Sequence, residues 1–458
     1  MSQQSVFQSR SPTDGRVLET FSIMEDGGIR DLLEDAHRAF GHRRVTSLPQ
    51  RAAQLQRMGE ILLRDADELG RLITTEMGKP IAEAVAEVEK CARVCRYYAE
   101  RGAGFLSDRE VKTEAARSLV RHEPLGIILG IMPWNFPFWQ VFRFAVPTLM
   151  AGNVVILKHA PSVPLCALAI EELIGEAGVE PGSFQNLFAT PNQLEWVIAD
   201  DRVRGVSLTG SVAAGRAVAS HAGSAIKRSV LELGGSDPLI VMPSADLEAA
   251  LDTAVTSRTI NSGQSCIAAK RLLVSRDIYD EFVPRFTERM AALRVGDPLD
   301  RETQIGPLAS ESIRAELDRQ VRETIDLGAR PLVGGEPLPG PGFFYPPTVL
   351  ADVPSGSPAD REELFGPVAS VFAVEDAGDA IRLANSTRYG LGASVWTRGA
   401  EEQQRFSEEL EAGQVFVNAM VASDPRLPFG GVKDSGYGRE LGREGILEFV
   451  NVKTVWIA

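Results

Sequence analysis

The stretch that decides the fold is LGIILGIMPWNFPFWQVF, from Leu125 to Phe142. It carries no charged residue and is long enough to cross a bilayer. Two interpretations are therefore open, a membrane-spanning helix and a buried strand followed by a turn. A membrane helix fails, because Pro133 and Pro137 would break its hydrogen-bond ladder and Asn135 would need a polar partner in lipid. We therefore expect a buried strand and a turn, in a protein that does not contact a membrane.

Short strand-like runs alternate with helical segments on both sides of this stretch. The runs are GIILGI (126–131), NVVILK (153–158), FQNLF (184–188), RGVSLTG (204–210) and KRSVLEL (227–233). The helical segments lie near 138–150, 164–177, 193–199 and 212–221. Strands rich in Val, Ile and Leu between helices predict a parallel sheet covered on both faces, which is typical of nucleotide-binding proteins.

The same alternation resumes after LGGSDP, in the runs PLIVM, RLLVS, VASVFAV, GASVWT and GQVFVN. A second α/β domain is expected, since 458 residues exceed the size of one hydrophobic core. Residues 26–104 have a helical pattern instead. Residues 111–126 and the final NVKTVWIA have strand-like patterns, and we expect them to form an arm whose exposed edges pair between subunits.

Composition excludes several classes of function. With 44% apolar and 24% charged residues the chain is typical of a soluble globular protein, and a net charge of −14 argues against a nucleic-acid partner. Four cysteines at irregular spacing, without a CxxC pair, predict neither a disulfide framework nor a metal site. The first residues, MSQQSVFQSRSPTDGR, lack the apolar core of a signal peptide. These features favour a cytoplasmic protein.

The cysteines differ in their surroundings. Cys91 and Cys95 share the apolar stripe of one helical segment and Cys166 lies in VPLCALAI, so all three are predicted to be packing residues. Cys266, in NSGQSCIAAK (261–270), has small and polar neighbours, which suits a thiol that a substrate must approach.

Other candidates lie where predicted strands end. Glu232, in LELGGSDP, is a candidate general base, and the glycines after it permit close backbone approach. Gly210 and Ser211 form a strand-to-helix turn that suits a pyrophosphate, although a tight turn with a serine cap explains them equally well. Lys158 follows a strand, where it either binds ribose hydroxyls or is a solvated charge.

Five ordered motifs resemble those of the aldehyde dehydrogenase superfamily over nearly the whole chain, most closely the bacterial succinate-semialdehyde dehydrogenases. They are PWNFP (133–137), LELGGSDP (231–238), NSGQSC (261–266), EELFGP (362–367) and PFGGVKDSGYGRE (428–440). The resemblance implies two parallel, Rossmann-like α/β domains and an oligomerisation arm, assembled as a homodimer or homotetramer. Its implied bounds are 1–106 with 125–232 for the cofactor domain, 233–427 for the catalytic domain, and 107–124 with 441–458 for the arm.

The resemblance also implies a mechanism without a metal. Cys266 is the expected nucleophile, which forms a thiohemiacetal and then a thioester with the aldehyde. The Asn135 side-chain amide and the Cys266 backbone N–H are expected to hold the oxyanion. Glu232 is the expected base that activates water, so that the product is a free acid.

The cofactor implied by the resemblance is NAD or NADP. Its expected contacts are Trp134, Lys158, Gly210, Ser211, Glu363 and Phe365. NAD-preferring relatives often carry an acidic residue three positions after the lysine, where it repels a 2′-phosphate. Pro161 occupies that position, which leaves both dinucleotides open.

For the substrate, the resemblance implies a small carboxylated aldehyde. Arg143 matches an arginine that binds the distal carboxylate, and Ser423 and Arg426 are further candidates. The mammalian enzyme's second arginine is replaced by Ile260. Succinate semialdehyde is the expected substrate, and a broader aliphatic or another ω-carboxylated aldehyde, such as glutarate semialdehyde, is the alternative. A cofactor-free cysteine hydrolase and a catalytically silent structural protein are the rivals from other classes.

Overall fold

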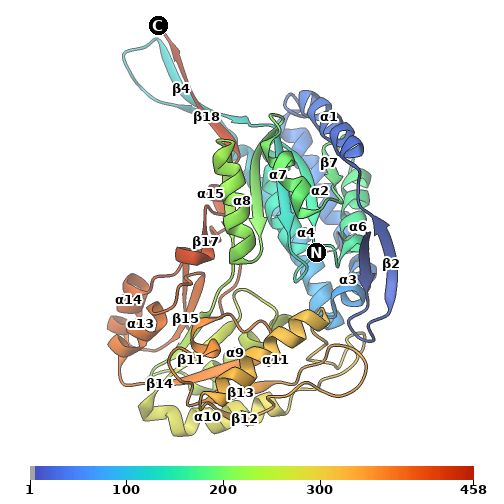
Figure 1. Cartoon of the computed structure of the whole chain (residues 1–458). Helices are drawn as coiled ribbons and strands as arrows, with labels where there is room; N and C mark the ends of the chain where they lie inside the picture. Colours follow the sequence, from blue (N-terminus) through green and yellow to red (C-terminus); the bar gives the residue numbers. More distant parts are fainter. Residues whose placement is uncertain (1–5) are drawn as a thin grey trace.

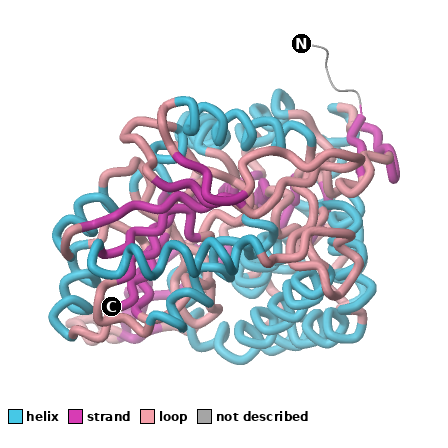
Figure 2. Tube along the Cα trace, turned by 90° about the horizontal axis from the view of Figure 1, so that it is seen from below, coloured by secondary structure: helices cyan, strands magenta, loops and turns pink. Residues whose placement is uncertain are grey.

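The computed structural model describes residues 6–458 and contains two parallel-stranded sheets, each flanked by helices. Figure 1 shows the two sheets in separate halves of the molecule, with a ribbon of two strands extending from one of them. In Figure 2 most helices surround the strands, and the small β1–β2 ribbon lies at one edge. The expected α/β class is confirmed.

The first sheet has the strand order β17-β9-β8-β5-β6-β7. Its strands are β5 (Ile127–Met132), β6 (Val154–His159), β7 (Phe184–Asn186), β8 (Val203–Thr209), β9 (Arg228–Glu232) and β17 (Gly436–Tyr437). The first five are parallel and match the predicted runs, whereas β17 returns from the C-terminal part of the chain and pairs antiparallel with β9. The connecting helices are α5 (Trp139–Ala151), α6 (Pro164–Glu176), α7 (Pro191–Ala199) and α8 (Val212–Ser224).

The stretch from Leu125 to Phe142 therefore forms a buried strand, a turn and the first turn of a helix. In α5 every residue is buried, because the helix packs between the sheet and the N-terminal helices. No helix in the described part of the chain is both long enough and apolar enough to span a bilayer.

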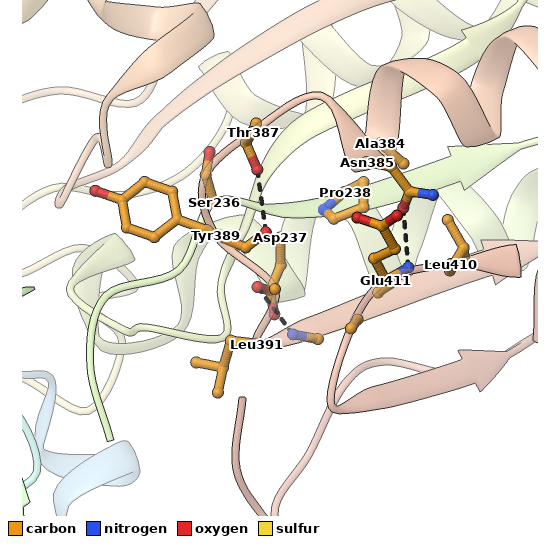
Figure 3. Close-up of a pocket in the computed structure, with 14 residues that line it drawn as sticks. Ser236, Asp237, Pro238, Ala384, Asn385, Thr387, Tyr389, Leu391, Leu410 and Glu411 are labelled. Carbon is orange, nitrogen blue, oxygen red and sulfur yellow. Dashed lines mark hydrogen bonds between the residues drawn. The ribbon is translucent and has the colours of Figure 1, made fainter. Parts of the chain in front are cut away.

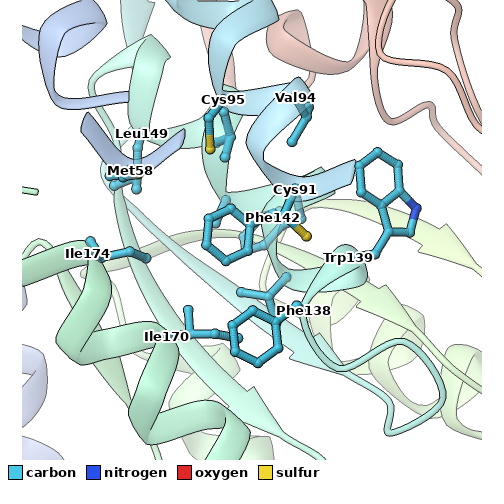
Figure 4. Packing of buried hydrophobic residues seen from close by; sticks show 14 of the residues in the cluster. Met58, Cys91, Val94, Cys95, Phe138, Trp139, Phe142, Leu149, Ile170 and Ile174 are labelled. Carbon is cyan, nitrogen blue, oxygen red and sulfur yellow. The ribbon is translucent and has the colours of Figure 1, made fainter. Parts of the chain in front are cut away.

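The predicted N-terminal helical region consists of α1 (Asp26–Arg43), α2 (Leu48–Arg64), α3 (Ala66–Met77) and α4 (Ile81–Leu106). Helix α4 packs against α2, α3 and α5, and the apolar residues between them form the largest core cluster (Figure 4). Cys91, Cys95 and Cys166 are fully buried in this cluster, as expected of packing residues.

The second sheet has the order β12-β13-β14-β11-β10-β15-β16. Its strands are β10 (Asp237–Val241), β11 (Ala269–Ser275), β12 (Arg330–Val333), β13 (Thr348–Ala351), β14 (Val368–Val374), β15 (Gly392–Trp396) and β16 (Gln414–Val417). The sequence patterns did not predict β12 and β13. Edge strand β12 contains Pro331 and is the only antiparallel member among the described strands of this sheet. The helices around it are α9 (Leu247–Thr259), α10 (Arg276–Ala291), α11 (Glu311–Asp326), α12 (Pro358–Arg361), α13 (Ala377–Asn385) and α14 (Ala400–Glu409).

Two ribbons complete the fold. Strands β1 (Val6–Arg10) and β2 (Val17–Ser22) pair near the N-terminus, and β18, β4 and β3 form a separate three-stranded sheet. In the latter, β4 (Arg117–Pro124) pairs along its whole length with β18 (Val450–Ile457), which follows α15 (Gly442–Leu447), and β3 (Arg109–Glu110) flanks β4. The two segments expected to form an arm thus pair with each other, while the residue bounds of the domains stay predictions.

Candidate active site

The loop that carries Cys266 lies between the two sheets and is held in a strained conformation. It begins with the short 3₁₀ helix Ile260–Gly263, in which Asn261 and Ser262 have φ values of 56° and 53°. Non-glycine residues adopt this left-handed region only when their surroundings hold them there. The Asn261 side chain donates to the backbone oxygens of Asn135 and Gln264, and the Ser262 hydroxyl accepts from the Gly306 N–H.

Lys270 braces the other end of this loop. Its ammonium group donates to the backbone oxygens of Ser265 and Cys266, each at 2.6 Å, and forms an ion pair with Glu363 at 3.1 Å. Two N–H donors of the buried lysine therefore have backbone acceptors, and its charge has a counter-ion in Glu363. The side chain connects the nucleophile loop to the segment that carries Glu363.

Asn135 lies in the turn between β5 and α5, next to the nucleophile loop. Its side-chain NH₂ group donates to the Gln264 carbonyl at 3.0 Å, while its oxygen accepts from the Gln140 amide at 3.0 Å. One N–H of Asn135 has its acceptor in Gln264, so the second is left for another one. The backbone N–H of Cys266 also donates to no residue within 6–458. These two donors are therefore available to an oxyanion near the sulfur.

The turn of Asn135 is closed by His159, a residue without a predicted role. Its Nδ1 accepts from the Ala160 N–H and lies 3.2 Å from the Met132 carbonyl oxygen, and its Nε2 lies 2.9 Å from the Pro137 carbonyl oxygen. Burial lowers the pKa of His159 to about 4, so the ring stays neutral and this pattern persists at physiological pH.

Glu232 ends strand β9 and is buried with an unpaired carboxyl group. Neither carboxyl oxygen accepts a hydrogen bond from any described residue, and Gly430, whose added Cβ would lie 2.7 Å from Oε1, leaves room for it. Burial without a hydrogen-bond donor raises the pKa of Glu232 well above its usual value, although Arg143 opposes the shift. Arg143 itself forms an ion pair with buried Glu440.

The glycines after Glu232 allow the two halves of the site to approach. A Cβ on Gly235 would lie 2.7 Å from the Cys266 carbonyl oxygen, and one on Gly234 would clash with the Glu363 carboxylate. Next to them, Asp237 accepts from the Gly392 N–H at 3.1 Å and so ties this segment to β15 (Figure 3). Burial raises the pKa of Asp237 to about 8. The pocket beside Asp237 does not include Cys266 in its lining.

Two cavities meet at the Cys266 side chain. The first, with about 580 Å³ of empty space, is lined by Pro133, Trp134, Asn135, Gln140, Thr209, Gly210, Ser211, Leu233, Gly234, Cys266, Glu363 and Phe365. Trp134 and Phe365 meet edge to face in it, with ring centroids 5.8 Å apart. The second, of about 530 Å³, is lined by Lys90, Phe136, Trp139, Gln140, Arg143, Ile260, Ser265, Cys266, Ile267, Met420, Val421, Ala422, Ser423 and Phe429.

The electrostatic environment keeps the thiol protonated in the free protein. Burial raises the pKa of Cys266 to about 12, and the positive charges of Lys270 and Arg143 only partly oppose this shift. At neutral pH the sulfur is therefore a neutral thiol that must lose its proton when it reacts.

Comparison with known families agrees with this geometry. The model of the aldehyde dehydrogenase family matches residues 1–455. The chain belongs to the aldehyde dehydrogenase family. The expectation drawn from the five motifs is confirmed, and the structural neighbours described next carry the same fold.

Curated relatives of this aldehyde dehydrogenase include two that match over almost their whole length. Succinate-semialdehyde dehydrogenase (NADP+) 1 of Mycobacterium tuberculosis is 51% identical over 98% of this chain and 99% of its own. The probable succinate-semialdehyde dehydrogenase (NADP+) of Synechocystis shows the same three values. Among solved structures, succinic semialdehyde dehydrogenase of Streptococcus pyogenes in complex with NADP+ has a TM-score of 0.96 at 39% identity, covering 98% of this chain and 99% of that one.

Within this aldehyde dehydrogenase, most of the predicted site residues lie around one of the two cavities. Trp134, Gly210, Ser211, Glu363 and Phe365 line the first cavity, and Arg143 and Ser423 line the second. Ser211 also caps α8 by accepting from the Ala214 N–H, so the structural interpretation of that turn holds as well.

Three predicted residues, Glu232, Lys158 and Arg426, are absent from the linings of both cavities. Lys158, at the end of β6, is absent from both linings, and burial lowers the pKa of its ammonium group to about 8. Arg426 is exposed and paired with Asp424, outside the second cavity. Their proposed contacts stay predictions.

Several residues of the site had no assigned role in the sequence patterns. They are Lys90, Gln140, Thr209, Lys270, Phe429 and Glu440. All of these except Lys90 lie within the stretches already quoted, so the motifs around them offered a signal. Lys90 lies in an ordinary helical segment that offered none.

Proposed function

We propose that this aldehyde dehydrogenase oxidises succinate semialdehyde to succinate with NAD or NADP as hydride acceptor. The observation that carries the proposal is the meeting of two cavities at Cys266, one lined by dinucleotide-type features and the other by cations and a hydroxyl. The names of the relatives at 51% identity support the same substrate.

In the first step, the Cys266 sulfur bonds to the aldehyde carbon, the thiol proton passes to water, and the π electron pair of the carbonyl moves to its oxygen. The resulting oxyanion accepts hydrogen bonds from the Asn135 side-chain amide and the Cys266 backbone N–H. Such preorganised donors typically contribute about 3 kcal/mol each to transition-state stabilisation. The bracing of both donors by Gln264, Gln140 and Lys270 lets them act without reorganisation.

The first cavity has the features that a nicotinamide dinucleotide requires. The N-terminus of α8 at Ser211 offers backbone N–H groups to a pyrophosphate, and Glu363 offers a carboxylate to ribose hydroxyls. Trp134 and Phe365 supply aromatic walls. The bound dinucleotide supplies the hydride acceptor, and the resulting thioester on Cys266 is left for hydrolysis.

Glu232 is the proposed base for that hydrolysis. Burial raises the pKa of Glu232, and a carboxylate with a raised pKa is a stronger base once it is ionised. Once ionised, it takes a proton from water as the water oxygen attacks the thioester carbon, and the Cys266 thiolate leaves. In Glu232→Gln, we expect the first turnover to persist and steady-state turnover to fall by about 100- to 10,000-fold. Rapid-quench kinetics measures both phases, and equal loss of both would contradict the assignment.

A second candidate is a broader aliphatic or other ω-carboxylated aldehyde dehydrogenase. The second cavity favours this alternative through its apolar wall, which includes Trp139, Ile267 and Phe429. One methylene changes binding by only about 1–3 kcal/mol in such surroundings. A panel of succinate semialdehyde, glutarate semialdehyde, butanal and pentanal, each run with NAD and with NADP, tests the proposal. The highest kcat/KM is expected for succinate semialdehyde, and a preference for the uncharged aldehydes would overturn it.

The choice of dinucleotide is tested at Pro161. An acidic side chain there would repel a 2′-phosphate, so Pro161→Glu is expected to lower kcat/KM with NADP more than with NAD. An equal effect on both would show that position 161 does not face the adenosine ribose.

We propose further that the protein is a cytoplasmic homodimer or homotetramer joined through the β4–β18 ribbon. Val452, Trp456 and Ile457 are each about half exposed on this ribbon, which extends from the body in Figure 1. The four cysteines are free, as in a reducing compartment. In analytical sedimentation, Trp456→Lys should form smaller particles than the wild type. Val45→Lys, which changes an exposed apolar residue away from the ribbon, should keep the size of the wild-type assembly. An unchanged assembly in Trp456→Lys would refute the role of the ribbon.

A further inference from the structure

We propose that Lys90 is the cation that receives the distal carboxylate of the substrate, an assignment that rests on the proposed function. Lys90 lies on α4 and lines the same cavity as Cys266, in a segment to which the sequence patterns assigned no role. The inference changes which residue selects carboxylated aldehydes.

The position of the Lys90 ammonium group is set by two contacts. It lies 4.2 Å from the centre of the Trp139 ring and donates a hydrogen bond of 2.6 Å to the Ser423 hydroxyl. An ammonium group has three donors, so two N–H bonds remain after Ser423 is satisfied. The Ser423 oxygen accepts from Lys90, which frees its own O–H to donate. Lysine and serine together therefore present donors to the two oxygens of one carboxylate.

The charges of the other cations near the cavity are already compensated. Arg143 is ion-paired with Glu440, donates to the Thr209 hydroxyl at 3.3 Å and stacks on the Phe429 ring. Arg426 is paired with Asp424 and exposed. Lys90 forms no ion pair with any residue in 6–458. A substrate carboxylate would supply the missing counter-charge, and a buried charge pair of this kind is strongly favoured over an isolated buried charge.

The titration of Lys90 offers a test that needs no mutation. Burial lowers the pKa of Lys90 to about 8, and Arg143 contributes in the same direction. The ammonium form is therefore lost above that pH in the free enzyme, which weakens its attraction for a carboxylate. The titratable and charged groups that face it are Glu87, Cys91 and Arg93 on α4, Arg143 on α5 and Asp424 in the loop before Pro428.

In the wild type, we expect the ratio of kcat/KM for succinate semialdehyde to that for pentanal to fall as the pH rises above about 8. The ratio cancels the titration of Cys266 and Glu232, because both aldehydes depend on those groups. In Lys90→Arg the guanidinium stays charged, so the alkaline fall should move to higher pH or vanish. A flat ratio in the wild type would overturn the assignment.

Substitution provides the second test. Lys90→Met keeps an unbranched side chain, one atom shorter, and removes its charge, so the same ratio at pH 7 should fall about 30-fold or more. The inhibition constant of succinate, used as a competitive inhibitor of pentanal oxidation, should rise by a similar factor. Arg96→Met removes a cation from an exposed position of the same helix and is the matched control, in which the ratio should change less than about threefold.

The outcomes separate this inference from the proposed function. If the wild type prefers succinate semialdehyde but Lys90→Met has the same ratio of kcat/KM values as the wild type, the function stands and Lys90 is not the carboxylate receptor. A fall of that ratio in Arg143→Met would then assign the carboxylate to Arg143. If the wild type prefers glutarate semialdehyde, the same ratio is measured with that aldehyde. A wild type that prefers pentanal overturns both.

Discussion

The two cavities that meet at Cys266 are built in different ways. The first is lined mainly by turns at the ends of β5, β8 and β9, in which each contributing group lies within a few residues of a strand end. The second collects side chains from α4, α5, the nucleophile loop and the segment 420–429. Backbone and turn geometry therefore shape the proposed dinucleotide cavity, whereas the proposed substrate cavity depends on side chains from remote elements.

This difference has a physical consequence for substitution. A turn at a strand end is held by backbone hydrogen bonds and glycines, so it tolerates a changed side chain nearby but resists changes of backbone conformation. A wall of converging side chains can change its charge or shape at one position without disturbing the chain around it. Variants should therefore separate the chemistry at Cys266 from the selection of the aldehyde.

The largest effect on activity is expected at Cys266, which lines both cavities. In Cys266→Ala, dehydrogenase activity should fall on the order of 10,000-fold or more with every aldehyde, because no thioester can form. Dinucleotide binding, measured by titration calorimetry, should be retained, since the turns of the first cavity do not depend on the sulfur. Near-normal turnover in this variant would contradict the assignment of Cys266 as the nucleophile.

Asn135→Ala should have the next largest effect. Loss of an oxyanion donor lowers kcat by roughly 100- to 1,000-fold, equally for charged and uncharged aldehydes, because the donor faces the carbonyl oxygen. Steady-state kinetics with succinate semialdehyde and pentanal measures both. A loss confined to KM would indicate that Asn135 only shapes the cavity.

A smaller effect is expected from Lys270, which braces the loop between the cavities. Burial raises the pKa of Cys266 to about 12 and the charge of Lys270 opposes it, so Lys270→Met should raise that pKa further. At a fixed pH below the pKa, the thiolate fraction falls about tenfold for each unit by which the pKa rises. Alkylation of Cys266 by iodoacetamide at pH 8 should therefore slow by about tenfold or less. Lys158→Met is the control, because Lys158 does not act on the Cys266 charge. Faster alkylation in Lys270→Met would contradict the sign.

The smallest effect belongs to the helix cap on the dinucleotide side. Ser211→Ala removes the acceptor for the Ala214 N–H and should destabilise the first turn of α8 by about 1 kcal/mol. Hydrogen exchange of that amide should accelerate about fivefold, while exchange in α5 stays unchanged. Unchanged exchange at Ala214 would mean that the cap carries no measurable free energy.

The sequence alone could predict the parts of the site that follow local rules. The five parallel strands of the first sheet, the turn of Gly210 and Ser211, and the unusual neighbours of Cys266 all depend on short-range pattern. The Leu125–Phe142 stretch resolved correctly into strand, turn and helix because two prolines and an asparagine cannot be accommodated in lipid. Strand β12 was missed because a short edge strand with a proline has no clear period, and β13 was missed because its four residues are too few to show one.

By itself, then, the sequence determined the α/β class and the family motifs, and it proposed the reacting groups. Only the tertiary structure decided which cations are free: it joins Arg143 to Glu440 across nearly 300 residues of chain, pairs Arg426 at the surface and brings Lys90 to Ser423 beside Cys266. The physical reason is that the charge a substrate meets depends on partners remote in sequence, and no local pattern records which carboxylate lies beside which cation.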